Sequence, residues 1–134
     1  MVTSTLAGLF DFLVFFVISV VLVALYLGIY TLATMHNEFA LIRRNVISAS
    51  TALGFSLVGF ALPLGSAIVH AQGIVDLLVW GLVALAVQIV VYWLVRIVMP
   101  NLSQRIAGGE MAAALFLGAS SLSAGIINAA SMTF

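Results

Sequence analysis

The stretch "HNEFALIRRN", residues 36–45, separates two long apolar runs and decides how the chain is organised. The chain has only four acidic and four basic residues, and three of these eight, Glu38, Arg43 and Arg44, lie here. About 20 consecutive apolar residues in a helix span the hydrocarbon core of a bilayer. The run on each side is long enough, so the stretch is expected to connect two membrane-spanning helices and to anchor them at the membrane surface.

The composition of the whole chain agrees with a membrane environment. Of its 134 residues, 65% are hydrophobic and 6% are charged, and the mean hydropathy is +1.35. A soluble domain of this size needs far more charge to cover its surface. The net charge of zero gives no electrostatic basis for binding nucleic acid. The N-terminus has no basic residue ahead of its apolar run, so we expect a retained helix rather than a signal peptide.

Four segments are long and apolar enough to cross a membrane. Every backbone polar group must be satisfied inside the hydrocarbon core, which leaves helices as the expected conformation. The fold class is therefore an all-α membrane protein with four transmembrane helices, in a single integral membrane domain over residues 1–134. The expected spans are Leu6–Thr34, Val46–Val69, Ile74–Met99 and Met111–Met132.

The arginines predict the orientation. Arg43 and Arg44 lie in the first gap, Arg105 lies in the third, and Arg96 stands just before Pro100. Because basic residues favour the cytoplasmic side, these two gaps are expected in the cytoplasm and both termini outside it.

The chain also shows signs of an internal duplication. "DFLVF" at Asp11 is similar to "DLLVW" at Asp76, and "TMHN" at residue 34 is similar to "VMPN" at residue 98. We expect two tandem two-helix repeats in parallel orientation, over about residues 1–70 and 71–134. The symmetry predicts that Asp11 and Asp76 both lie in the first turns of their helices near the outer surface. There they either stabilise the helix N-termini or attract cations to an outer vestibule.

Small residues predict which helices pack at the centre. Gly118 and Gly125 belong to a stripe in the fourth span that ends at Asn128, and Gly59 belongs to a similar stripe in the second span. Such stripes let helix backbones approach closely in lipid. The second and fourth helices are therefore expected at the centre. Pro63 cannot donate to the carbonyl of Gly59, so the second helix is expected to kink.

Each span carries an uncharged polar residue near its middle: Ser19, Ser56, Gln88 and Ser121. They either form hydrogen bonds between helices or line a water-accessible path. The amide of Gln88 is the largest of these groups and is costly to bury alone. It must therefore turn toward the second and fourth helices or toward a neighbouring subunit.

Catalysis has little support. The serines of "GASSLSAG", residues 118–125, have no histidine in any expected span to activate them. His36 and His70 fall in gaps on opposite sides of the membrane and cannot share a metal. The absence of cysteine excludes thiolate chemistry. We expect no enzyme, no cofactor and no metal site.

The motifs of the chain resemble those of a known family. The resemblance runs along nearly the whole chain and is carried by "HNEFALIRRN", "PLGSAI", the pair Asp76 and Trp80, Gln88, "RIVMPNLSQRI" and "GIINAASMTF". The family that the chain resembles is domain-of-unknown-function family 350, which comprises small bacterial inner-membrane proteins. The resemblance implies a plasma-membrane protein of unassigned activity. It also implies an association with envelope-stress and ATP-grasp-type systems, and a suggested channel role.

Two functions remain open at this point. The first is a channel-like or small-solute conduit linked to envelope stress. The alternative is a non-conducting structural or signalling scaffold that self-associates and docks partners at its cytoplasmic loops. The expected partners are the lipid bilayer, further copies of the chain, and a cytoplasmic protein at residues 35–45 and 100–110. In the first of these loops, Glu38, Arg43 and Arg44 are the candidate contact residues.

Overall fold

The computed structural model describes residues 2–34 and 38–132, and these residues form six helices. The four long helices are each long and apolar enough to cross a membrane, which confirms the expected all-α membrane fold. Their ends lie within a few residues of the expected spans. The long helices are α1 (Val2–Ala33), α3 (Ile47–His70), α4 (Ile74–Val98) and α6 (Met111–Ser131), and the short ones are α2 (Glu38–Arg43) and α5 (Leu102–Ala107).

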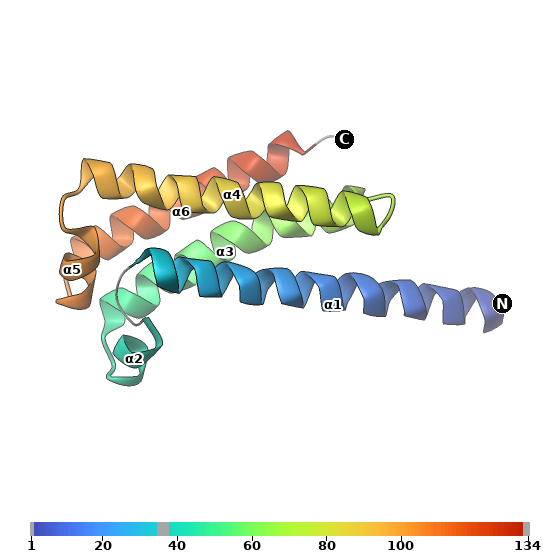
Figure 1. Cartoon of the computed structure of the whole chain (residues 1–134), viewed down its shortest axis with the longest axis horizontal. Helices are drawn as coiled ribbons and strands as arrows, with labels where there is room; N and C mark the ends of the chain where they lie inside the picture. The colour runs from blue at the N-terminus through green and yellow to red at the C-terminus, as the bar shows by residue number, and fades with distance from the viewer. Residues whose placement is uncertain (1, 35–37, 133–134) are drawn as a thin grey trace.

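The long helices run along the longest axis of the molecule, and the two short helices lie together at one end (Figure 1). The order long, short, long occurs twice along the chain. Each short helix is followed by a residue with positive φ, Asn45 at 64° and Gly109 at 91°, residue types that tolerate this conformation. The duplication nevertheless stays a prediction.

The two short helices were not expected from the sequence, which indicated only gaps. A helix of six residues is too short to show a periodic pattern and is unstable alone, so packing against the bundle must hold it. Leu41 of α2 and Leu102 and Ile106 of α5 are buried. The hydroxyls of Tyr92 and Ser103 lie 2.9 Å apart, within hydrogen-bonding distance, and tie α5 to α4.

Helices α3 and α6 form the centre of the bundle, as their small residues predict, and make the most extensive contact of any helix pair. A Cβ atom at Gly125 would collide with the carbonyl of Gly59, and one at Gly59 would collide with the carbonyl of Ser121. At Gly118, a Cβ atom would lie 2.8 Å from the Cβ of Phe55. Glycine at these positions is what allows the two backbones to touch.

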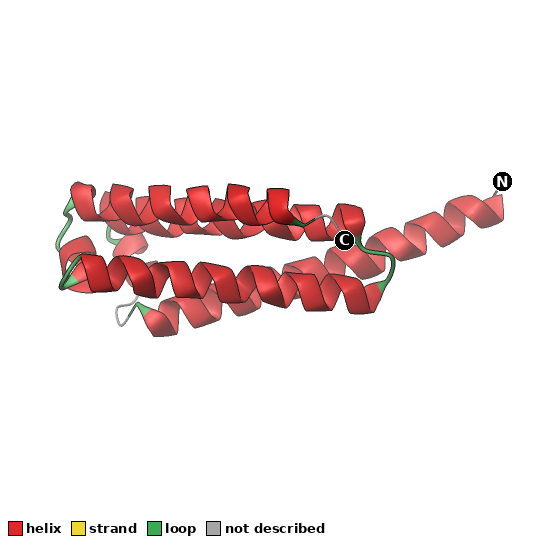
Figure 2. Cartoon of the chain, turned by 90° about the horizontal axis from the view of Figure 1, so that it is seen from above, coloured by secondary structure: helices red, strands yellow, loops and turns green. Residues whose placement is uncertain are grey.

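Helix α1 packs on the bundle mainly through its C-terminal half, although Phe15 also packs partly against the core. Its buried residues begin at Ser19 and continue through Leu22, Tyr26 and Tyr30, and the N-terminal half diverges from the other helices (Figure 2). Asp76 lies in the first turn of α4. The same placement predicted for Asp11 is wrong, because α1 begins at Val2. The residues before Asp11 include nothing that stops a helix, whereas α4 has to begin after the tight connection that ends in Gly73.

Candidate functional site

Polar side chains meet where α3, α4 and α6 cross, and we call Ser56, Gly59, Gln88, Ser121 and Gly125 the central crossing. The Nε2 of Gln88 donates to the carbonyl oxygens of Gly59 at 3.0 Å and Ser121 at 3.1 Å. The Oγ of Ser56 donates to the Oγ of Ser121 at 3.3 Å. All five residues are buried. Gln88 therefore turns toward the central helix pair, one of the two orientations expected.

The carbonyl of Gly59 is available to Gln88 for a reason that lies in the sequence. In an α-helix this carbonyl would accept from the N–H four residues on, which here is Pro63. Proline has no N–H, and α3 continues through it as one helix. The Gln88 amide supplies the missing donor from another helix. Because both acceptors are carbonyls, the nitrogen end of the amide is assigned by its partners.

The other end of the Gln88 amide is less well satisfied. Its Oε1 is buried and accepts no hydrogen bond from the part of the chain that the structure describes. A buried acceptor without a partner is destabilising.

Ser19, the polar residue near the middle of the first expected span, does not take part in the central crossing. Its Oγ donates to the carbonyl of Phe15 in its own helix at 2.7 Å.

Two further serines of α3 donate across the bundle, one toward each end. The Oγ of Ser48 donates to the carbonyl of Ile106 at 2.6 Å, and the Oγ of Ser66 donates to the carbonyl of Ala129 at 3.0 Å. Together with Ser56, they join α3 to the C-terminal part of the chain at three heights.

The three tyrosines of the chain were not identified from the sequence as important residues, yet all are buried. Tyr26 stacks on Phe60 with ring centroids 4.7 Å apart, and its hydroxyl donates to the carbonyl of Ser56 at 3.4 Å. The rings of Tyr30 and Tyr92 lie 5.7 Å apart. The spacing of Tyr26 and Tyr30, four residues apart on one helix face, was the signal available in the sequence.

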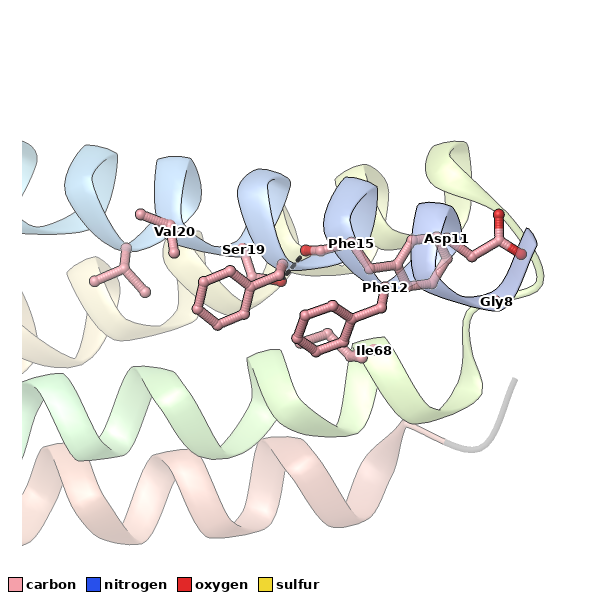
Figure 3. A pocket seen from close by; sticks show the side chains of 9 residues that line it. Gly8, Asp11, Phe12, Phe15, Ser19, Val20 and Ile68 are labelled. Carbon is pink, nitrogen blue, oxygen red and sulfur yellow. Dashed lines mark hydrogen bonds between the residues drawn. The ribbon is translucent and has the colours of Figure 1, made fainter. Parts of the chain in front are cut away.

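The polar residues near the α3–α4 connection do not form a cluster. The Oδ2 of Asp76 accepts from the backbone N–H of Gln72 at 3.1 Å, which closes the turn before α4. Asp11 lines a groove between α1 and α3 (Figure 3). Asn128 is half-buried, and its Nδ2 has no hydrogen-bond partner among residues 2–34 and 38–132.

The opposite end of the bundle carries the charged residues of the two short helices. Arg43 and Arg44 are exposed. The Nε of Arg105 lies 3.3 Å from the Oε1 of Glu110 in a surface ion pair. The side chain of Glu38 lies outside the described residues. Within the described parts of the chain, no three histidine, aspartate or glutamate side chains are grouped closely enough to hold a metal ion.

Four membrane-length helices that bury a polar crossing define a multi-pass helical membrane protein. The model of the family described as "Domain of Unknown Function (DUF350)" matches residues 4–132, and the chain belongs to this family. It is 42% identical over 129 residues to the protein named UPF0719 inner membrane protein YjfL from Escherichia coli strain K12. The match covers 96% of this chain and 98% of that relative. The relative of the same name from Escherichia coli O157:H7 matches equally well. No solved structure matches.

Proposed function

We propose that this chain is a non-conducting scaffold of the bacterial inner membrane, which self-associates and docks a cytoplasmic protein at the end that carries α2 and α5. The single observation that carries the proposal is the filled centre of the bundle. At the central crossing the backbones of Gly59 and Gly125 are in contact, and the amide of Gln88 fills the space beside them. This packing supports a structural role for the polar residues of the central crossing, which join α3, α4 and α6, rather than a role in lining a path for solutes.

The basic end of the molecule supports the docking role. The exposed side chains of Arg43 and Arg44 form no ion pair with a described residue, and α2 and α5 lie at the same end of the bundle (Figure 1). With the orientation expected from the arginines, this end faces the cytoplasm. Two exposed guanidinium groups at the end of a short, packed helix suit an acidic partner surface.

Self-association is expected through α1. None of the residues from Val2 to Ile18 is buried, and four helices of this size leave little room for further packing within one copy. The proposal includes no catalytic step, in keeping with the lack of cysteine in the chain.

Ion flux tests the non-conducting character. Full-length protein in liposomes is expected to give K⁺ and Cl⁻ flux no faster than protein-free vesicles, with the Gln88→Leu variant behaving identically. A flux that requires the wild-type protein and changes in a normally folded Gln88→Leu variant would contradict the scaffold and establish a conduit.

Docking is tested by crosslinking in cells, since the natural chain has no cysteine and single-cysteine variants are unambiguous. We expect adducts with a discrete protein from Phe39→Cys in α2 and Gln104→Cys in α5. The adducts should be lost when Arg43 and Arg44 are both changed to glutamate. Val69→Cys, exposed near the other end of α3, is the matched control. Equal adducts from Val69→Cys, or adducts that survive the charge reversal, would exclude this docking end.

The conduit remains the second candidate because of one specific observation. The buried Oε1 of Gln88 accepts from no described residue, and a water molecule reaching the central crossing would satisfy it. Since a single bundle is filled at this depth, such a path would require several copies.

A further inference from the structure

An apolar groove with a carboxylate at one end lies between α1 and α3. It has a volume of about 620 Å³ and is lined by α1 residues from Gly8 to Val23 and by Ile68 of α3. This volume falls within the range of roughly 300–1,000 Å³ typical of small-molecule sites. Phe12 and Phe16 stack with their ring centroids 5.6 Å apart and form part of one wall. The groove is therefore large enough for a substantial apolar ligand.

Asp11 marks the polar end of the groove. Figure 3 shows its carboxylate near the end of the bundle where α3 passes into α4, with Phe12, Ser19 and Val20 further along the same helix. Such a turn between spanning helices lies at the membrane surface. The rise of α1 from Asp11 to Val23 is about 18 Å, close to one leaflet of a hydrocarbon core of about 30 Å. The groove thus follows the depth of one leaflet.

The carboxylate of Asp11 has no cationic partner among residues 2–34 and 38–132. It makes no hydrogen bond or ion pair with another residue of the described ranges. All four arginines lie in or next to the connections at the opposite end, where α2 and α5 are found. His70, in the last turn of α3, has its Nδ1 within hydrogen-bonding distance, 2.9 Å, of the carbonyl oxygen of Ser66. A carboxylate beside an apolar surface is stabilised by a nearby cation.

We propose that this groove binds one ethanolamine phospholipid from the leaflet in which Asp11 lies. The ammonium of the headgroup pairs with Asp11, and one acyl chain lies along Phe12, Phe15, Val20 and Ile68. A second copy in the same orientation fits less well, because its own arginines lie at the other end and it brings a second Asp11 carboxylate. The site shares α1 with the self-association proposed above, which would use exposed residues outside the groove such as Val17.

Lipid retention tests the proposal. Full-length protein is exchanged into nanodiscs of equal palmitoyl-oleoyl phosphatidylethanolamine and phosphatidylglycerol, then extracted, and the lipids that remain bound are quantified by mass spectrometry. We expect phosphatidylethanolamine to be retained about fivefold over phosphatidylglycerol, the size of one partly exposed ion pair. The Asp11→Asn variant should bring this ratio close to one. Asp76→Asn, which changes the other outer carboxylate, should preserve it.

Filling the groove separates headgroup recognition from acyl-chain binding. Val20→Trp should abolish retention of both lipids. Gly8→Leu is a second filling variant, because a Cβ at Gly8 meets nothing within 4 Å and the fold should tolerate it. Helicity and elution volume establish that each variant is folded. Equal retention of the two lipids by the wild type, an unchanged ratio in Asp11→Asn, or full retention in both filling variants would overturn the proposal.

A second copy in the groove is detected separately. Val20 lines the groove, whereas Val17 is exposed on the same helix outside its lining. Disulfide crosslinking of Val20→Cys is expected to be weaker than that of Val17→Cys. Efficient crosslinking at position 20 in nanodiscs, with that at position 17 weak, would assign the groove to a protein partner and overturn the lipid site.

Discussion

Gln88 donates to the carbonyl of Gly59 the hydrogen bond that Pro63 cannot donate. The bond is 3.0 Å long and joins α4 to α3 at the centre of the bundle. Gly59 also lacks a side chain, which lets Gly125 of α6 lie against it. The carbonyl of Gly59, which Pro63 leaves without a donor inside α3, thus lies at a point where α3, α4 and α6 are in contact.

The Gln88–Pro63 relationship predicts an energetic coupling. Gln88→Leu should lower the free energy of unfolding by about 1–2 kcal/mol, because it removes two hydrogen bonds to buried carbonyls. In a Pro63→Ala background, the introduced alanine can supply its own N–H to the carbonyl of Gly59, so the same change should cost about half as much. The measurement is a double-mutant cycle by denaturant unfolding in micelles. An equal cost of Gln88→Leu in both backgrounds would show that Pro63 and Gln88 are not linked.

The contact between the central helices predicts that two glycines respond differently to alanine. Gly125→Ala places a methyl group against the carbonyl of Gly59 and should destabilise the protein by about 1–3 kcal/mol. Gly54→Ala, also inside a long helix, meets no atom within 4 Å and should be neutral or slightly stabilising. Thermal unfolding of the two variants in the same detergent gives the comparison. Similar melting temperatures would mean that the α3–α6 contact is looser than described.

The serines of α3 provide a second matched pair. Ser48 is buried and donates across to α5, while the exposed Ser50 donates only to Ile47 of its own helix. Ser48→Ala should cost about 0.6 kcal/mol, and up to about 1.7 kcal/mol, because the carbonyl of Ile106 loses its donor. Ser50→Ala should be close to neutral. Unfolding in denaturant measures both changes, and a larger effect at Ser50 would contradict the cross-bundle bond.

The orientation of the chain is testable with reporter fusions. Fusions after residues 40 and 104, within α2 and α5, should report the cytoplasm, and a fusion at the C-terminus should report the outer side. Alkaline phosphatase and a fluorescent protein give opposite signals on the two sides and serve as mutual controls. Cytoplasmic activity from the C-terminal fusion would overturn the orientation derived from the arginines.

The sequence by itself determined the four spans and the central helix pair. Lipid sets the length of an apolar helix, so "HNEFALIRRN" and "PNLSQRIAGGE" had to lie outside the hydrocarbon core. Small residues on α3 and α6 indicated close approach, because these helices cannot be driven together by the hydrophobic effect in lipid. Both inferences depend on the chemistry of single residues and their spacing along one helix.

Only the tertiary structure decided how the helices are turned and where α1 leaves the bundle. Leucine is as soluble in lipid as in a protein core, so hydropathy does not say which face of α1 or α4 is buried. Hence the particular atoms that Tyr26 and Gln88 contact, and the groove beside Asp11, could not be predicted from the sequence. Helices α2 and α5 were not predicted from the sequence for a related reason. Six residues form a stable helix only when neighbouring elements bury their apolar side chains.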